Sequence, residues 1–209
     1  AALAYQGLGL LRQQLPVRDR IHAIIDSGGQ TPNLIPQTAS LHINIRSRYA
    51  PTLRALSHRI EDVLHGAALM AGVQADIRWD SSPMTMPVRS NQTLGQRWVL
   101  AQREIGRNPY PAGTISDTLA ASTDFGNISL RLPGIHPLIQ IAPEGTGLHT
   151  AEFAAAAQSP RAEEAALDGA YGLAVVALDF LTDDALAADV QAEFEKAGGA
   201  VQVQTYFDS

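Results

Sequence analysis

Three side chains that could carry out chemistry lie near one another between residues 122 and 153: Asp124, His136 and His149. Glycines and two short apolar stretches separate them. Loops at the ends of strands commonly carry catalytic and ligand-binding side chains. We therefore expect the functional site in this part of the chain.

His149 is the candidate metal ligand. Small residues surround it, and Thr150 and Glu152 follow. Neutral imidazole binds zinc through one ring nitrogen while a neighbouring group orients the other. A catalytic zinc needs about three protein ligands plus a position for water, and the chain contains no His-Glu-x-x-His pair. From spacing alone, a loop histidine that hydrogen-bonds a carbonyl group is the simpler interpretation.

The same segment resembles the C-terminal signature of the zinc-dependent amidohydrolases and metallopeptidases, a family that includes aminoacylase, carboxypeptidase G and the aminobenzoyl-glutamate hydrolases. It is most similar to the branch of aminobenzoyl-glutamate hydrolase and the β-alanyl-lysine type dipeptidases. The matching motifs are Ser-Thr-Asp-Phe-Gly-Asn-Ile-Ser at 122–129, Pro-Gly-Ile-His-Pro at 133–137, and His149 with Thr150 before an acidic residue. Ala121 departs from the pattern, which usually has glycine there. The resemblance implies that His149 is the last of the metal ligands.

The composition indicates a globular chain. Its 209 residues are 45% hydrophobic, enough for a buried core. A net charge of −6 argues against a nucleic-acid or anionic-membrane partner. Cysteine is absent, which excludes disulfides and thiolate ligands and fits a reducing cytoplasm. The first residues lack the basic and apolar regions of a signal peptide. We expect a soluble, cytoplasmic protein.

Hydrophobic periodicity predicts five secondary-structure elements in the first part of the chain. They are a helix over 1–15, strands over 20–27 and 38–48, a helix from Pro51 to Gly72, and a strand over 73–79. This order is that of a ferredoxin-like βαββαβ unit without its first strand. We therefore expect the chain to begin at the helix that normally follows the first strand, which leaves one edge of the sheet unpaired.

The first part also resembles the lid or dimerisation domain of the same family, at His22, Gly28-Gly29, 33–36 and Arg46. The resemblance implies that Asn33 and Arg46 bind the substrate carboxylate. It implies that His22 acts in catalysis by polarising the scissile carbonyl in the site of the partner protomer. A planar guanidinium suits a carboxylate, and histidine can stabilise an oxyanion.

Structural interpretations of these residues stay open. Asn33 can fix a turn, Arg46 can be a solvated strand residue, and His22 can pair across the sheet. The remaining histidines of this part, His42, His58 and His65, are expected on the surface.

The second part of the chain is predicted to be an α/β segment. The expected elements are a helix over 91–105, strands over 128–132 and 137–141, a helix over 160–181, a helix from 183 to 198, and a tail at 201–207 that is a strand or is ordered by contacts. In the 160–181 helix we expect an inward stripe of apolar residues: Ala166, Ala170, Leu173, Ala177 and Phe180. The predicted domains are residues 1–82, an incomplete lid, and 83–209, the C-terminal portion of an α/β catalytic domain.

The resemblance implies a metal-dependent hydrolase of an amide bond next to a carboxylate, with two divalent ions: zinc, or else manganese or cobalt. The family's other metal ligands and its catalytic glutamate belong to an N-terminal half and are not in this sequence. Glu163-Glu164 comes after the signature, on a predicted helix start, and the resemblance places no ligand at Asp117 or Asp124.

Two hypotheses follow. In the first, the chain is the C-terminal half of an amidohydrolase or dipeptidase, inactive alone, that acts on a small amide substrate and forms a homodimer through its lid. In the second, it is a non-catalytic dimerisation or ligand-binding module. The first is better supported, because the His149 motif has no evident use without further ligands.

Overall fold

The computed structural model describes residues 1–79, 84–110, 114 and 123–207. The chain is mixed α/β and forms two compact units. Unit 1 comprises Ala1–Pro87, Ile115–Asp124 and Gln202–Ser209, and unit 2 comprises Val88–Thr114 and Phe125–Val201. The domain boundary expected after residue 82 falls outside the described residues.

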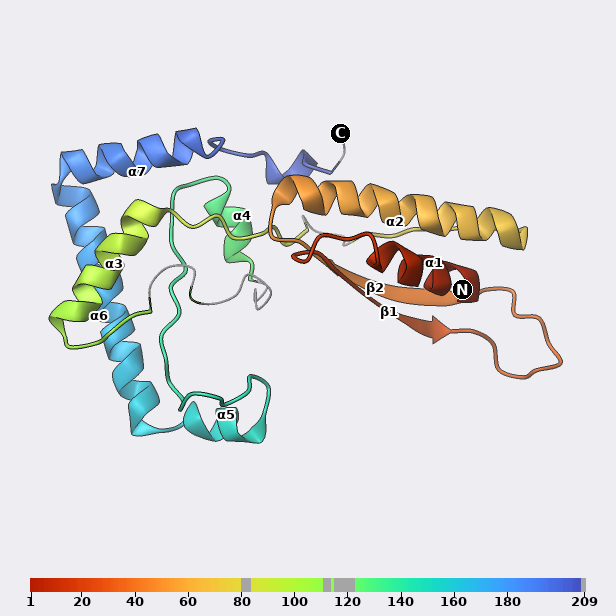
Figure 1. The fold of residues 1–209 in the computed structure, drawn as a ribbon, viewed down its shortest axis with the longest axis horizontal. Helices are drawn as coiled ribbons and strands as arrows, with labels where there is room; N and C mark the ends of the chain where they lie inside the picture. The colour runs from red at the N-terminus through yellow and green to blue at the C-terminus, as the bar shows by residue number, and fades with distance from the viewer. Residues whose placement is uncertain (80–83, 111–113, 115–122, 208–209) are drawn as a thin grey trace. The chain divides into compact units, whose positions relative to one another are not determined.

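Unit 1 is a β-hairpin covered by two helices. Its elements are α1 (Ala2–Arg12), β1 (Arg20–Ser27), β2 (Ser40–Arg46), α2 (Ala50–Ala71) and a short 3-10 helix, η2 (Val203–Thr205). Figure 1 shows α1 and α2 side by side along the hairpin. The strands and both long helices match the predicted elements to within a few residues, because caps and periodicity mark them in the sequence. Gly72, for example, ends α2 in the left-handed conformation.

The core of unit 1 is one apolar cluster made by the helical stripe and the inward strand positions. Its buried members are Leu8, Leu11, Ile21, Leu56 and Ile60. The two helices approach closely at Gly7, where a Cβ atom would lie 2.7 Å from Val63 Cγ1. This packing fixes the hairpin on the helices.

The hairpin exposes its other face. β1 and β2 are antiparallel, with Arg20 opposite Arg46 and His22 opposite Asn44. His22 and Asn44 are exposed while their neighbours Ile21 and Ile45 point toward the core. Alternation along the strands therefore puts the candidate histidine on an open surface.

The predicted third strand of unit 1 is wrong. Residues 73–79 form neither a helix nor a strand, and Ala75, Ile77 and Trp79 are half-buried while the residues between them are exposed. Trp79 packs on the unit 1 core, and its indole N–H donates to Glu61. Within the described residues no strand pairs with this segment, and an extended segment forms a sheet only where a neighbour satisfies its N–H and C=O groups.

Unit 2 is helical. Its elements are α3 (Gln92–Glu104), α4 (Phe125–Ser129), α5 (Ala151–Ala156), α6 (Pro160–Thr182) and α7 (Asp184–Lys196). Its buried core cluster is Leu94, Trp98, Val176 and Val190. Side chains of Asn91, Thr150, Ser159 and Asp183 cap the N-termini of α3, α5, α6 and α7. The predicted long helices of this part are confirmed.

The contact between α3 and α6 has no room for a side chain at Gly172. A Cβ atom there would lie 2.4 Å from Gln102 Nε2 and 2.8 Å from Trp98 Nε1. Gln102 is fully buried and its amide donates to the carbonyl oxygen of Asp168 at 2.7 Å. Glycine thus sets the distance between the two helices.

The predicted strands at 128–132 and 137–141 are wrong. Ile128 and Ser129 belong to α4, and residues 137–141 form neither a helix nor a strand. No sheet forms among the described residues of unit 2. Strand pairing is a non-local event that local apolar composition alone does not determine. The tail at 201–207 holds η2 and is ordered by contacts, among them Arg54 over the ring of Tyr206.

The predicted inward face of α6 is also wrong. All five expected core positions of this helix lie outside the buried core, namely Ala166, Ala170, Leu173, Ala177 and Phe180. The buried positions are Ala165, Gly172 and Val176, which face α3 and α7. α6 is apolar on both faces, so periodicity does not tell which face these two helices cover.

α6 is also the one helix in the described ranges that is long and apolar enough to cross a membrane by length and composition. Core helices of soluble proteins meet the same criterion, so length and composition do not by themselves assign α6 to a membrane. α6 packs against α3 and forms an ion pair to it from Asp179 to Arg97.

The N-terminus of α3 is held by a carboxylate from α7. Glu193 accepts hydrogen bonds from the backbone N–H groups of Gln92 (2.6 Å) and Thr93 (2.9 Å) and from the Thr93 hydroxyl (2.7 Å). Burial alone would raise the pKa of Glu193, but these hydrogen bonds lower it below its ordinary value of 4.5. The charged form is therefore stabilised in the folded state.

Replacing Ile60 by Ala should lower the free energy of unfolding by about 2–4 kcal/mol, because the side chain is fully buried in the unit 1 core. Urea denaturation followed by circular dichroism measures the change. Leu69→Ala on the same helix is the control and should cost less than about 0.5 kcal/mol, since Leu69 is 81% exposed. Equal costs for the two variants would contradict the assigned core.

Glu193→Gln should destabilise unit 2 by about 1–2 kcal/mol at neutral pH, because a charged acceptor at a helix N-terminus is lost. The folded-state pKa lies below the unfolded value, so this stabilisation is present above about pH 5 and disappears as the pH falls through the folded-state pKa. Thermal unfolding followed by Trp98 fluorescence in a Trp79→Phe background measures it. If the stability difference between wild type and Glu193→Gln grew as the pH was lowered, this role of Glu193 would be contradicted.

Candidate functional site

The exposed face of the unit 1 hairpin brings two predicted site residues together. His22 lies opposite Asn44, and Arg46 is two residues further along β2 on the same face. The Arg46 Nε–H donates to the Asn44 side-chain oxygen at 3.3 Å. Asn44, which sequence analysis did not single out, thus lies between the histidine and the guanidinium. Its signal in the sequence was only its place in the strand alternation.

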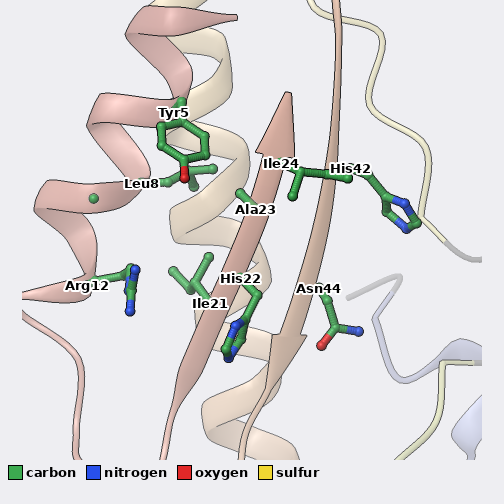
Figure 2. A pocket seen from close by; sticks show the side chains of 10 residues that line it. Tyr5, Leu8, Arg12, Ile21, His22, Ala23, Ile24, His42 and Asn44 are labelled. Carbon is green, nitrogen blue, oxygen red and sulfur yellow. The ribbon is translucent and has the colours of Figure 1, made fainter. Parts of the chain in front are cut away.

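A hollow of about 470 Å³ adjoins this face. Its walls come from α1 and the hairpin: Tyr5, Leu8, Gly9, Arg12, Ile21, His22, Ala23, Ile24, His42 and Asn44. Figure 2 shows the side chains of His22 and Asn44 extending from adjacent strands, with Arg12 on α1. The polar groups that line the hollow can donate hydrogen bonds, and no carboxylate is among the described lining residues. The lining suits an uncharged or anionic oxygen-rich molecule.

Asn33 lies apart from these residues. It is exposed in a turn of the loop that joins β1 to β2, whereas Arg46 pairs with Arg20 at the far end of the hairpin. Seven residues of antiparallel strand span roughly 20 Å. One copy of the hairpin therefore does not bring Asn33 and Arg46 onto the same small carboxylate. As expected, His42, His58 and His65 are exposed.

The loop before α5 holds His149 in an uncommon conformation. Its φ is 63°, and it is the one non-glycine residue with positive φ in the described ranges. Thr150 closes the loop, because its hydroxyl donates to the Gly147 carbonyl oxygen at 2.8 Å and accepts from the Phe153 N–H at 3.2 Å. The imidazole is exposed. Left-handed backbone at a non-glycine residue concentrates at functional sites.

Other residues of the matching motifs build the scaffold of unit 2. His136 stacks on Phe125 with ring centroids 5.2 Å apart. Ser129 is fully buried, donates to the Gly126 carbonyl oxygen and accepts from the Arg89 N–H, both at 3.0 Å. These two motif residues hold α4 and the following segment in place.

Tyr110 and Glu144 form a contact that sequence analysis missed. The Tyr110 hydroxyl donates to Glu144 in the segment that leads to His149. This hydrogen bond to a carboxylate raises the pKa of Tyr110. The two residues are far apart in sequence, and no local pattern signals the pairing.

The described residues do not complete a metal site. None of their His, Asp or Glu side chains form a group of three that could hold an ion. Asp124 is exposed and accepts from the Thr123 hydroxyl at 3.4 Å, and Glu163 lies in the first turn of α6. Asp117, Ala121 and Ser122 lie outside the described residues. His149 offers one ligand, and a catalytic ion needs about three.

Comparison with known proteins identifies relatives of both units. No protein-family model matches the chain. Over 195 residues, or 93% of its length, the chain is 34% identical to the Xaa-Arg dipeptidase of Mus musculus and 32% identical to that of Homo sapiens. It is 22% identical to one component of the p-aminobenzoyl-glutamate hydrolase of Escherichia coli (strain K12), over an alignment that covers 91% of this chain.

The chain is related to peptidases and amidohydrolases. The aligned region covers 45% and 44% of the two dipeptidases and 50% of the bacterial hydrolase component. The chain therefore spans about half the length of the curated relatives it matches. Because the alignments include over nine-tenths of the chain, they include residues of both units.

The left-handed backbone at residue 149 predicts that a glycine variant is more stable there than an alanine variant, the opposite of the order expected at most positions. His149→Gly should be more stable than His149→Ala by about 0.5–1 kcal/mol, because glycine adopts positive φ without strain. At the neighbouring exposed Leu148, the alanine variant should be the more stable one. Thermal unfolding of the four variants measures both differences. The same order at both positions would show that residue 149 is not strained.

Proposed function

We propose that the chain is the C-terminal part of a metal-dependent amidohydrolase or dipeptidase that hydrolyses an amide bond next to a carboxylate. The supporting observation is the similarity, over 93% of the chain, to relatives named as dipeptidases. Unit 1 is then a ferredoxin-like lid and dimerisation domain, and unit 2 is the C-terminal portion of the catalytic domain. This assignment accounts for the exposed His149 loop and for the incomplete metal site among the described residues.

In this proposal His149 is one ligand of a centre that holds two divalent ions, zinc or alternatively manganese or cobalt. The other ligands are residues outside the 209. Two features support the role of His149. Its imidazole is exposed, and the chain has histidine at a backbone conformation that favours glycine.

Arg46 binds the substrate carboxylate, and His22 donates a hydrogen bond to the carbonyl oxygen of the amide. The planar guanidinium can form two parallel hydrogen bonds to a carboxylate. A histidine N–H directed at the carbonyl oxygen stabilises the charge that develops there. Asn44 supports both, because it accepts from Arg46 and faces His22.

The proposal includes a homodimer formed through unit 1. Asn33 and Arg46 lie at opposite ends of the hairpin, so both reach one carboxylate only if they come from two copies. The described sheet has two strands, so β1 has an outer edge, where Ile24 and Ile25 are largely exposed. An exposed apolar strand edge is a site for pairing with another chain.

The substrate class follows from the names of the relatives. A dipeptide that ends in arginine and p-aminobenzoyl-glutamate both contain an amide bond beside a free carboxylate. We propose dipeptides, N-acyl amino acids or aminobenzoyl-glutamate as substrates. A guanidinium and hydrogen-bond donors on the hairpin suit that shared carboxylate.

A non-catalytic ligand-binding module is the alternative function. The observation in its favour is that the described residues hold a hollow of about 470 Å³ but no complete metal site. An activity assay on the complete polypeptide discriminates between the enzyme and the ligand-binding module. Hydrolysis of any of the three proposed substrate types in the presence of zinc, manganese or cobalt would exclude the module.

The 209-residue chain alone should bind no stoichiometric zinc, because it supplies one ligand where about three are needed. The complete protein should hold two metal ions per chain and lose at least one in His149→Ala. Elemental analysis after dialysis measures both. His136→Ala is the matched control and should retain the metal, since that ring stacks on Phe125. Unchanged metal content and activity in His149→Ala would remove the assignment.

Arg46→Lys in the complete protein should raise KM by about 10- to 100-fold with a smaller change in kcat, because lysine cannot make the paired hydrogen bonds of a guanidinium. Steady-state kinetics on a dipeptide measure the change. Arg59→Ala, on α2, should leave both constants unchanged, since Arg59 bonds Gln14. An unchanged KM in Arg46→Ala would show that another residue holds the carboxylate.

A further inference from the structure

Arg20 and Arg46 lie directly opposite each other on the unit 1 hairpin. Their neighbours Ile21 and Ile45 belong to the core, so both arginines are on the exposed face of the hairpin. Residues opposite each other in an antiparallel pair have Cβ atoms about 5 Å apart, and like charges at these positions destabilise the pairing. A departure of this kind from the local rules of folding is expected at functional sites.

No acidic side chain on this part of the face compensates the two charges. Residues 20–24 and 42–46 include none, and neither arginine forms an ion pair with a described residue. Asp19 is buried and accepts a hydrogen bond from the Ser47 hydroxyl at 2.7 Å, and Asp26 lies near the far end of β1. The chain has a net charge of −6, so two adjacent positive charges are not a general property of its surface.

Each guanidinium keeps a pair of N–H groups that bond nothing else in the described part of the chain. The Arg20 Nη1 group donates to the carbonyl oxygens of Val17 and Asp19, which leaves Nε and Nη2. The Arg46 Nε–H donates to the Asn44 side-chain oxygen at 3.3 Å, which leaves Nη1 and Nη2. Either pair can form two parallel hydrogen bonds to a carboxylate. A carboxylate has about four lone-pair positions, enough to accept from both guanidiniums at once.

The candidate catalytic histidine lies beside the arginine pair. His22 follows Arg20 by two residues on the same face of β1 and lies opposite Asn44 on β2, as Figure 2 shows for the last two. In an N-acyl amino acid, one nitrogen and one carbon atom separate the carbonyl carbon of the amide from the carboxylate carbon. The groups that bind the amide and the carboxylate must therefore be close together. His22 and the arginine pair are about 7 Å apart along the strand, within the reach of their long side chains.

We propose that Arg20 and Arg46 together bind one carboxylate, the one beside the amide bond of the substrate. Arg20 is then a second residue that binds the substrate, and the resemblance described above did not indicate it. The inference rests on the proposed function, under which Arg46 binds the carboxylate and His22 the amide carbonyl. It adds that a single free carboxylate occupies both guanidiniums, so a substrate in which that carboxylate is amidated is rejected.

NMR titration of the 209-residue chain tests the binding without hydrolysis. N-acetylglycine has one carboxylate beside an amide and should shift the backbone signals of Arg20, His22 and Arg46. N-acetylglycinamide lacks the carboxylate and should bind at least about 10-fold more weakly, because the hydrogen bonds to a charged acceptor are lost. Equal binding of the two compounds would overturn the inference.

Variants of both arginines test whether they share the carboxylate. Arg20→Gln and Arg46→Gln should each weaken the binding of N-acetylglycine by at least about 10-fold. Arg59→Gln removes the same charge from α2 and is the matched control, with an unchanged dissociation constant. N-acetylglycine has a single carboxylate, so an effect of only one of the two arginines would assign them to separate groups and overturn the shared site.

Arg20→Lys is the conservative variant and keeps the positive charge. It should bind N-acetylglycine more tightly than Arg20→Gln and less tightly than the wild type, because an ammonium group cannot form the paired hydrogen bonds. In the complete protein it should raise KM for a dipeptide by about 10-fold or more with a smaller change in kcat. A structural role of Arg20 alone would lower stability and leave KM unchanged, and that result would overturn the inference.

The outcomes separate this inference from the proposed function. Binding that depends on both arginines, in a complete protein that hydrolyses no amide, would support the shared carboxylate site and reject the enzyme. Hydrolysis with a KM that responds to Arg46→Lys and not to Arg20→Lys would support the enzyme and reject the shared site.

Discussion

The backbone N–H and C=O groups of an extended chain need partners, and this requirement governs the structure. β1 and β2 meet it because a hairpin loop brings them together, and their pairing defines one core face and one exposed face. Residues 75–79 and 138–141 show the same alternation of burial, and no strand in the described part of the chain pairs with them. Both units, as far as they are described, therefore consist of well-packed helices together with a sheet that is small or missing. The candidate site residues follow this division, because His22 and Arg46 lie on paired backbone and His149 lies on a loop fixed by its own turn.

Local signals were enough to predict the long helices. Pro51 at the start of α2, Gly72 at its end and the Asn91 cap of α3 are all readable in the sequence. Strands were predicted where the composition was apolar, and only the hairpin was confirmed, because its partner strand is the next element along the chain. The orientation of α6 was mispredicted for a related reason. Both of its faces are apolar, so only the neighbouring helices reveal which one is covered.

The sequence indicated which residues belong to the candidate site, but it did not indicate how they are arranged in space. The matching motifs pointed to His149, and the resemblance pointed to His22, which the structure shows to be exposed on the hairpin. The distance of Asn33 from Arg46 depends on hairpin register, which single residues do not encode. The Tyr110 contact with Glu144 joins segments far apart in the chain, and it emerges only once the helices of unit 2 are packed. The positive φ of His149 was also unforeseen, because histidine gives no sign of a position that favours glycine.

That positive φ bears on any attempt to make the protein more heat-resistant. Glycine adopts positive φ without strain, so residue 149 is a natural position for a stabilising substitution to glycine. The substitution should raise the unfolding temperature while removing the imidazole, so a screen that scores survival on heating would enrich molecules without the histidine on which the proposed function depends. Under that proposal, folding and chemistry favour different residues at position 149. A library for this protein should therefore keep position 149 fixed.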